Sequence, residues 1–392
     1  MKLLPISYAT RNLARSPGRA CLSVGGSMLV VLLVLASAGF VTGMRTSIVA
    51  SGSARNTILM AAGSVESIER SEVGMQTSGI LAASVEGLRR LGGVEAISPE
   101  IHIAMPVSRT DPAGVVNAGA SVVFRGVTPA AWLVHEGALL EAGRPPEAGR
   151  GEVSLGRMAA RSLGFDPASR SIGNRLWVGA EPLDVVGIHS GSGSVIEGEA
   201  WIDLVDLQVI AQRDSLSCVV LTRDVATPES INDFAVSRLD LELVAIEETD
   251  YYATLASFYR PIQWMVVLTA ILVAFGGIVG GLNTTYASFA SRVRELGTLQ
   301  TIGYSRPAIM ISLVQESLLA SAIGALLACV VGLALVDGIA IRFSMGVFGI
   351  RIDTLVVAGA LATGLLLGVL GALVPAWRCL RLPIPEALRT SL

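Results

Sequence analysis

Residues 261–290 read PIQWMVVLTAILVAFGGIVGGLNTTYASFA, a run of thirty residues without a charged side chain. An α-helix rises about 1.5 Å per residue, so about 20 apolar residues cross the roughly 30 Å hydrocarbon core of a bilayer. Segments 20–44, 309–336 and 354–377 are also long and apolar enough to do so. The sequence therefore predicts a membrane protein with four transmembrane helices.

The composition fits a membrane bundle joined to one globular domain. Of the 392 residues, 52% are hydrophobic and 16% are charged, with a mean hydropathy of +0.62. Segment 45–260 is long enough for a domain of its own. Lys2 is the sole lysine, so no GxxxxGK[ST] phosphate-binding loop exists. We therefore expect no cofactor on this chain and expect ATP and Mg²⁺ to be bound by another one.

Basic residues in the short flanking segments predict the orientation of the spans, because Arg and Lys resist translocation. Residues 1–19 carry four basic residues and no acid, while 291–308 and 378–392 each carry three against one acid. We expect these segments, and hence both termini, on the cytoplasmic side of an inner membrane. Segment 45–260, with 17 arginines and 27 acids, and the short 337–353 loop are then outside.

The first apolar run has an alternative interpretation as a signal peptide. It follows basic residues and contains Ala36-Ser37-Ala38, an A-x-A sequence. The hydrophobic region of a signal peptide has about 7–15 residues, whereas 20–44 has 25. We therefore favour an uncleaved first span.

The outside segment has the mixed periodicity of an α+β domain. Apolar residues at helical spacing predict a helix over 80–91, ended by Gly92-Gly93. Strands are expected at 94–107, 121–127, 152–155 and 218–222, a hairpin over 176–188 and a mobile loop at 191–199. Segment 249–259, rich in tyrosine, is either a helical stalk that continues into the second span or an interfacial aromatic belt.

Metal-binding and catalytic signals are weak in this segment. His102, His135 and His189 show no metal-ligand spacing, and Cys218 is the sole cysteine between 45 and 260, which excludes a disulfide there. No GxSxG elbow surrounds a serine. We expect neither a metal site nor a catalytic site, so the chain is not expected to be an enzyme.

Several stretches resemble one family in their order and spacing around the spans. They are ATRNLARSPGRACLSVGG (9–26), GVEAISPE (93–100), FRGVTPAAW (124–132), LEAGRPPEAGRGEVSLG (140–156), LDVVGI (183–188), SRVRELGTLQTIGYSRPAIMISLVQESLLASAIGALLACVVGLAL (291–335) and PAWRCLRLPIPEALR (375–389). Together they resemble the FtsX-like permease family, in its MacB-type branch of ABC transporters. Cys379, Leu380 and segment 56–77 depart from the family pattern, which leaves the subfamily and its cargo open.

The resemblance implies a fold and a set of partners. The fold would be four transmembrane helices with a large α+β domain, a MacB-type periplasmic core, inserted between helices 1 and 2. Two permease chains, identical or not, would work with two cytoplasmic ATPase chains, membrane lipid and a periplasmic adaptor or carrier; no nucleic acid is implied. The function would be export or extraction of a hydrophobic or amphiphilic substrate such as a lipid, lipoprotein or drug. The alternative is a mechanotransmission protein that activates a periplasmic or wall-associated partner without transport.

The loop 291–308 is the predicted contact with the ATPase. Its apolar residues recur at near-helical spacing among charges, which predicts a short amphipathic helix able to seat in a partner cleft or to lie flat on anionic lipid. The predicted coupling residues are Arg292, Val293, Arg294, Glu295, Leu296, Gly297, Leu299, Ile302 and Gly303. The N-terminal segment 1–19, which includes Tyr8, is a second candidate contact or an interfacial helix.

Two features inside the spans also point to function. Gly276, Gly277, Gly280 and Gly281 form overlapping GxxxG pairs, which allow another helix to approach closely, either from a second chain or within this one. Glu316 lies near the start of the third span, where exposure to lipid would cost about 2.5–3.5 kcal/mol. We expect it to face protein, water or the interface in a structural or coupling role, ahead of proton or ion transport.

Overall fold

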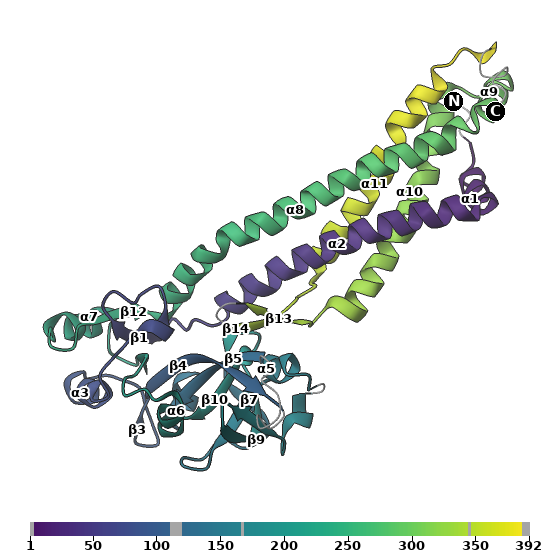
Figure 1. Ribbon diagram of the computed structural model, residues 1–392. Coiled ribbons are helices and arrows are strands. Elements are labelled where there is room, and N and C mark those ends of the chain that lie inside the picture. Colours follow the sequence, from purple (N-terminus) through teal and green to yellow (C-terminus); the bar gives the residue numbers. More distant parts are fainter. Residues whose placement is uncertain (1–3, 110–119, 166–167, 344–345, 386–392) are drawn as a thin grey trace. The chain divides into compact units, whose positions relative to one another are not determined.

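The computed structural model describes residues 4–109, 120–165, 168–343 and 346–385. The chain divides into two compact units (Figure 1). The helical unit comprises Met1–Thr42, Pro261–Ile339 and Ile350–Leu392, and the sheet unit comprises Gly43–Arg260 and Ala340–Gly349. Lys2 and the tail from residue 386, both used to predict orientation, lie outside the described residues.

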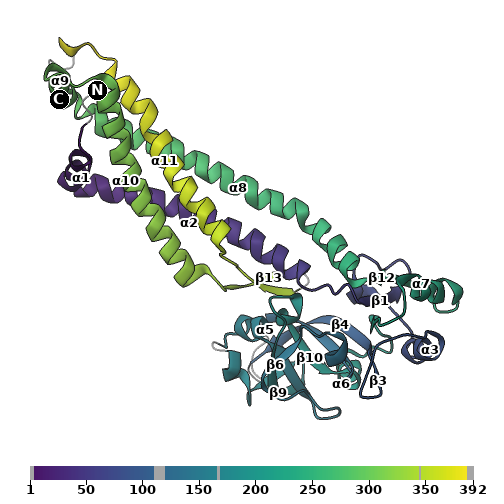
Figure 2. The same ribbon diagram turned by 180° about the vertical axis from the view of Figure 1, so that it is seen from behind.

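The helical unit is built from long apolar helices, seen from two sides in Figure 1 and Figure 2. Its helices are α1 (Ile6–Arg15), α2 (Pro17–Val49), α8 (Glu248–Ala290), α9 (Val293–Thr301), α10 (Arg306–Val331), a π-helical turn η4 (Gly332–Val336) and α11 (Thr354–Leu380). Four segments of the described chain are long and apolar enough to cross a membrane: α2, α8, α10 with η4, and α11. α2 and α8 continue past the unit boundary into the sheet unit.

Small residues let α10 approach both α11 and α2. A Cβ atom built on Gly364 of α11 would lie 2.5 Å from the Ala325 side chain, and one on Gly368 would lie 2.9 Å from the Leu318 Cα atom. On the other side of α10, a Cβ on Gly324 would lie 2.5 Å from the Val24 carbonyl oxygen of α2. Glycine at these positions is therefore required by close helix packing, as is common in membrane bundles.

A ten-stranded sheet forms the sheet unit, in the order β12-β1-β11-β4-β5-β10-β7-β9-β6, with β8 paired to β4 and β9. The strands are β1 (Asn56–Ala61), β4 (Ile97–Ser108), β5 (Ala120–Val127), β6 (Leu139–Gly143), β7 (Glu152–Gly156), β8 (Arg175–Val178), β9 (Glu181–Ser190), β10 (Glu199–Asp203), β11 (Cys218–Thr222) and β12 (Leu243–Glu247). The helices are α3 (Thr77–Ser84), α4 (Ala131–Val134), α5 (Arg157–Ser162), α6 (Leu204–Ala211) and α7 (Pro228–Ser237).

The long strand β4 joins two parts of this sheet. Residues Ile97 to Glu100 pair with β11, whereas Ile101 to Val107 pair with β5. Glu100 therefore lies where the strand changes its partner, and it is fully buried. This change of partner brings side chains of β4, β5, β10 and β11 together in the core, where the charged cluster described below is found.

The predicted helix over 80–91 is too long. α3 ends at Ser84, and Val85 is extended. Gly92 and Gly93, with φ of 59° and 85°, form the turn of a small hairpin between β2 (Arg90–Leu91) and β3 (Val94–Glu95). Two consecutive residues with positive φ are typical of a tight hairpin turn, so this glycine pair connects strands and does not end a helix.

The segment predicted as a mobile loop, 191–199, is held by a buried carboxylate. Glu197 lies in the short 3-10 helix η3 (Val195–Gly198) and is 3% exposed. Its Oε1 accepts hydrogen bonds from the backbone amide of Gly193 at 3.0 Å and from Arg157 Nη2 at 2.8 Å. The glycine-rich composition suggested mobility, but a single acidic side chain orders the turn.

The connection between α10 and α11 is a hairpin that belongs to the sheet unit. It consists of β13 (Ala340–Phe343) and β14 (Gly346–Gly349). A Cβ atom on Gly198 of η3 would lie 2.5 Å from the Val347 carbonyl oxygen, so the two backbones are in direct contact. The Arg342 guanidinium also donates a hydrogen bond to the Ser162 carbonyl of α5.

The tyrosines at the start of α8 are part of the sheet unit. Tyr251 and Tyr252 are 4% and 9% exposed, and their rings meet edge to face with centroids 5.3 Å apart. α8 begins at Glu248 and runs without a break to Ala290. These two side chains therefore pack into the domain core and do not form an aromatic belt.

Candidate coupling site

Helix α9 follows α8 and precedes α10 in the chain, and its apolar side packs against the other helices of the helical unit. Leu296 is 1% exposed and Val293 is 7% exposed. They share a core with Phe289, Ile309, Leu313, Ala372, Ala376, Cys379 and Leu380, against which Leu299 also packs. Leu296 and Val293 are therefore covered by the ends of α8, α10 and α11, so in this structure they do not lie on a side of α9 that a partner could contact.

The opposite side of α9 is exposed among the described residues. Arg294, Glu295 and Thr298 are exposed, and Ile302 is 70% exposed just beyond the helix end. Gly303 follows with φ of 101°, a conformation that favours glycine and ends the helix. A partner that binds this exposed side would therefore contact polar side chains and one apolar side chain, that of Ile302. Gly297, which the sequence also placed among the coupling residues, is buried.

Arg292, immediately before α9, pairs with Glu316 of α10. Its Nη1 lies 3.1 Å from Glu316 Oε1 and 3.0 Å from Oε2. Asn12 of α1 donates from Nδ2 to the same Oε2 at 3.4 Å. Glu316 thus has a cationic partner and a neutral one inside the protein, which removes the need to face lipid.

The N-terminal helix α1 contributes Tyr8 to the same hydrogen-bonded network. The Tyr8 hydroxyl donates to Glu295 Oε1 at 2.7 Å, and Arg292 Nε donates to Glu295 Oε2 at 3.2 Å. Burial would raise the pKa of Glu295, but the Tyr8 hydroxyl and the Arg292 charge outweigh it and hold that pKa below its usual value. The two candidate contact segments of the sequence, 1–19 and 291–308, are therefore joined in one hydrogen-bonded cluster.

Sequence reasoning overlooked Asn12 in this cluster. It lies four residues after Tyr8, on the same side of α1, and is 6% exposed. The available signal was the i, i+4 spacing of two polar side chains on an otherwise apolar face. Only the fold shows that this face meets Glu316.

The four glycines of α8 separate into two pairs. A Cβ atom on Gly277 would lie 2.7 Å from Val30 Cγ2 of α2. One on Gly281 would meet nothing within 4 Å among the described residues, although a Cβ on Gly371 of α11 would lie 3.9 Å from the Gly281 carbonyl carbon. Gly276 and Gly280 are exposed, with no neighbouring atom in the described chain within 4 Å of an added Cβ. Gly277 is therefore closely packed within the chain and Gly281 lies near α11, whereas Gly276 and Gly280 have open space around them among the described residues.

A buried charged cluster occupies the core of the sheet unit around Arg125 of β5. Arg125 donates to both carboxylate oxygens of Glu199 at 2.7 Å and to Glu100 Oε2 at 3.0 Å. Trp201 Nε1 donates to Glu199 Oε2 at 3.0 Å. Burial would raise the pKa of Glu100, but His135 and Arg125 outweigh it and hold that pKa well below its ordinary value.

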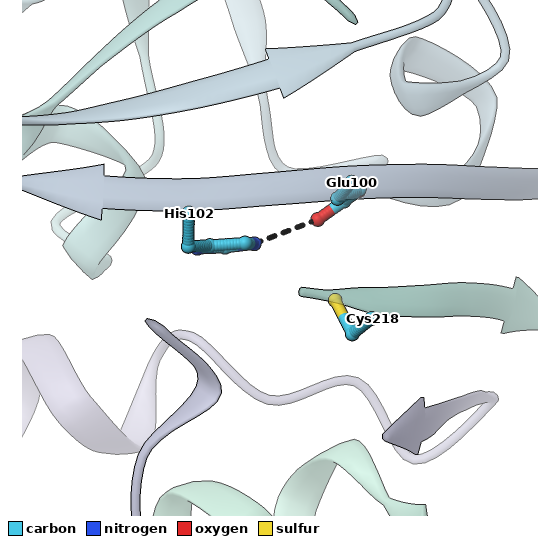
Figure 3. A group of neighbouring side chains, drawn as sticks. All are labelled: Glu100, His102 and Cys218. Carbon is cyan, nitrogen blue, oxygen red and sulfur yellow. Dashed lines mark hydrogen bonds and ion pairs between the residues drawn. The ribbon is translucent and has the colours of Figure 1, made fainter. Parts of the chain in front are cut away.

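Figure 3 shows a potential metal-ligand group at the edge of this cluster. His102 Nε2 lies 3.1 Å from Glu100 Oε2, and Cys218 lies directly opposite Glu100 on β11. The same Glu100 oxygen accepts the Arg125 hydrogen bond, and a permanently charged guanidinium beside it opposes a metal ion. Burial raises the pKa of the Cys218 thiol well above its usual value, which disfavours the thiolate that a metal requires. We therefore interpret the group as part of a structural ion-pair network.

Comparisons with known proteins match both units. Residues 20–235 match the MacB-like periplasmic core domain, and residues 266–384 match the FtsX-like permease C-terminal region. The macrolide export ATP-binding/permease protein MacB of Azoarcus sp. (strain BH72) is 26% identical over 380 residues, covering 93% of this chain and 56% of that protein. MacB of Escherichia coli (strain K12) is 24% identical over 240 residues, covering 61% and 35% respectively. The chain thus spans little more than half the length of the first relative.

Among solved structures, the periplasmic region of MacB from Actinobacillus actinomycetemcomitans is 11% identical with a TM-score of 0.38, covering 53% of this chain and 94% of that one. The extracellular domain of the noncanonic ABC-type transporter YknZ from Gram-positive bacteria is 14% identical with a TM-score of 0.37, covering 49% and 99%. The matched MacB-like region extends over more than half of the chain, and the FtsX-like region over most of α8, α10 and α11. The chain belongs to the MacB/FtsX-type family of ABC transporter permeases.

Proposed function

We propose that this chain is the permease subunit of an ABC transporter, in which ATP hydrolysis by a partner chain moves the sheet unit to export or extract a hydrophobic or amphiphilic substrate. In this proposal the termini and α9 are cytoplasmic and segment 45–260 is outside. The observation that carries it is the anchoring of α9. Leu296 fixes the helix to the bundle core, and the Arg292–Glu316 pair fixes its start to α10. A displacement of α9 by an ATPase is then transmitted to the spans.

The exposed side of α9 is the proposed docking surface for the ATPase, formed by Arg294, Glu295, Thr298, Thr301 and Ile302. Ile302 is the apolar residue that such a partner would bury. The basic flanks that favour anionic lipid also lie here, but an apolar side chain flanked by polar ones suits a protein groove equally. The Tyr8 hydrogen bond to Glu295 adds α1 to the surface that a partner would sense.

A second copy of the chain, or a related permease, is the proposed partner in the membrane. The open pair Gly276 and Gly280 allows a helix of that partner to approach α8 closely. Exposed Leu272 and Val279 flank the pair and supply apolar contact area. Gly277 is already packed against Val30 of α2 and Gly281 lies near Gly371 of α11, so these two glycines are not part of the proposed interface.

Mechanotransmission without transport is the second candidate function, and the β13–β14 hairpin favours it. The hairpin follows α10 and precedes α11 in the chain, yet its residues pack on η3 and α5 of the sheet unit. Motion of α10 and α11 therefore has a direct covalent route to the domain. A partner bound to the outer domain could be activated through this route with no substrate in the spans.

The substitution Ile302→Asp tests the docking surface. We expect the tagged variant, purified from its native membrane in mild detergent, to lose the copurifying ATPase chain and vanadate-sensitive ATPase activity. Val225→Asp is the matched control, because Val225 is 80% exposed on the sheet unit. Both variants should be inserted at wild-type levels. Full ATPase recovery with Ile302→Asp would overturn the assignment of this surface.

A further inference from the structure

A polar cavity of about 270 Å³ lies within the sheet unit, at the point where the chain leaves α2 and where β12 passes into α8. Ser51, Asn56, His135, Ser194 and Glu248 are among its lining residues. Arg55 and Glu136, both more than half exposed at their side chains, also line it. None of these residues was singled out for the coupling function, so the cavity is a separate feature of the domain.

Glu248 is the central acid of the cavity and is 2% exposed. One oxygen, Oε2, accepts hydrogen bonds from the Ser53 backbone amide and from Asn56 Nδ2, both at 2.9 Å. The other oxygen, Oε1, lies 3.9 Å from His135 Nδ1, which is beyond hydrogen-bond distance. The protein thus orients this carboxylate through one oxygen and leaves the second next to the imidazole.

The His135 ring presents an acceptor to the same space. Its Nε2 lies 2.7 Å from Glu100 Oε1 and donates its proton there, because the ionised Glu100 carboxylate can only accept. Arg125 Nη1, 3.1 Å from that nitrogen, donates to Glu100 Oε2 instead. In the neutral ring, Nδ1 is then an acceptor that faces a second acceptor, Glu248 Oε1.

Ser194 adds a buried polar atom without a hydrogen-bond partner. Its side chain is 4% exposed, and its Oγ has no hydrogen-bond partner among the described residues. Buried polar atoms in native proteins are nearly always hydrogen-bonded, so a cavity that leaves one unsatisfied indicates a missing occupant. Ser194 Oγ can accept a hydrogen bond, as can Glu248 Oε1 and the neutral His135 Nδ1, which face each other at 3.9 Å. The missing occupant should therefore be a donor.

We propose that this cavity binds the primary ammonium group of a small molecule or of a lipid headgroup. An ammonium has three N–H donors and one positive charge, which match Glu248 Oε1, His135 Nδ1 and Ser194 Oγ. Glu100 is committed to Arg125 and His135, so one buried carboxylate remains for the ligand, as suits a monovalent cation. The volume admits a ligand of a few heavy atoms beyond the amine, and Arg55 at the rim suits an anionic group such as a phosphate.

An amine bound here would join the two ends of the chain that enter the domain. Glu248 begins α8, and Ser53, which donates to it, follows α2. Occupancy would therefore stiffen the connections through which α2 and α8 reach the sheet. This inference is independent of the proposed ATPase coupling, and either can fail without the other.

The test uses the full chain in nanodiscs of phosphatidylglycerol, in phosphate buffer free of amines. Ethanolamine and phosphoethanolamine should each raise the melting temperature in a saturable manner, because a ligand of the native state stabilises it by mass action. Choline, whose quaternary nitrogen carries no N–H donor, should have no effect. Nanodiscs of phosphatidylethanolamine distinguish the sources: loss of the ethanolamine response indicates a lipid headgroup, and an unchanged response indicates a soluble amine.

The substitution Glu248→Gln should weaken ethanolamine binding at least about tenfold, because it replaces a buried charged acceptor by an amide of the same shape. Glu181→Gln, at an exposed carboxylate of the sheet unit that does not line the cavity, is the matched control and should retain binding. Ser194→Ala should weaken binding by a smaller factor, and it serves if Glu248→Gln fails to fold. An equal response to choline, a stabilisation by Zn²⁺ or Ca²⁺ alone, or wild-type affinity in Ser194→Ala and folded Glu248→Gln would each overturn the proposal.

Discussion

Arg292 contacts both carboxylate oxygens of Glu316 through a single nitrogen, Nη1, at 3.1 and 3.0 Å. The two side chains are only 13% and 12% exposed, so the pair is largely shielded from water. It ties the start of α9 to α10 at the place where Tyr8 and Asn12 of α1 also converge. The pair therefore connects the proposed ATPase contact to a span.

Removing either partner of this pair should disturb the bundle, because the remaining charge is left without its counter-ion. We expect Arg292→Ala and Glu316→Ala each to lower the melting temperature in detergent. Each should also reduce the ATPase activity of the purified complex measured without substrate. The double variant should be less impaired than the sum of the single variants, with an interaction energy of about 1–3 kcal/mol. Strict additivity in this double-mutant cycle would contradict a direct role for the pair.

The two glycine pairs of α8 predict two different phenotypes. Gly280→Leu should leave the monomer folded and shift the purified protein from dimer to monomer, because Gly280 has open space around it. Gly277→Leu should destabilise the chain itself, since Val30 already fills the space that a Cβ would need. Light scattering after size-exclusion chromatography and thermal unfolding separate the outcomes. A dimeric Gly280→Leu protein would rule out this face as the interface.

The hairpin contact predicts a local effect of Gly198→Ala. The new methyl group would lie 2.5 Å from the Val347 carbonyl oxygen, so β14 must move away from η3. Hydrogen exchange of the amides of Val347, Phe348 and Gly349 should become faster. Gly79→Ala is the control, since its added Cβ meets nothing within 4 Å. Unchanged exchange at the hairpin in Gly198→Ala would show that this packing is not maintained in solution.

Acid stability should depend on His189. Its Nδ1 lies 3.0 Å from Ser154 Oγ and its Nε2 lies 3.2 Å from the Ile196 carbonyl oxygen. Complete burial lowers the pKa of His189 to about 4, below the 6.5 of a free histidine. Between these values the unfolded chain binds a proton that the native protein does not. Stability therefore falls as the pH decreases from 6.5 toward 4, by about 2 kcal/mol between pH 7 and pH 5.

The variant His189→Gln checks this contribution. Chemical unfolding followed by tryptophan fluorescence at pH 7 and pH 5 should show a smaller loss of stability in the variant than in the wild type. Other buried groups, such as His102 and Glu100, titrate in both proteins, so the difference between the two slopes isolates His189. Parallel slopes would mean that His189 does not carry the effect.

The sequence by itself determined the four apolar helices and the mixed domain between the first two. Hydropathy is a local property that sums over about 20 consecutive residues, so no tertiary information is needed to find such helices. The hairpin of β8 and β9 and the strand β11 were predicted for the same reason, since turn residues and alternation act over short distances. The amphipathic character of α9 was also evident from residue spacing.

What the apolar face of α9 meets was decided by the tertiary structure. A pattern of buried and exposed positions says that one side is covered, but it does not say whether this chain or another covers it. The same ambiguity applies to Gly276–Gly280 and Gly277–Gly281, which lie on neighbouring ridges of one helix. Their different surroundings follow from where α2 and α11 pack.

The charged core of the domain was the part of the structure least predictable from the sequence. The five residues of this core are spread over about 150 positions of the sequence: Glu100, Arg125, His135, Glu199 and Glu248. Nothing in the residues around each one distinguishes it from a charged residue on the surface. They meet because β4 changes partners at Glu100 and because α8 begins next to the chain leaving α2. Ion pairs act through space over a few ångströms, so only the fold determines which distant charges become neighbours.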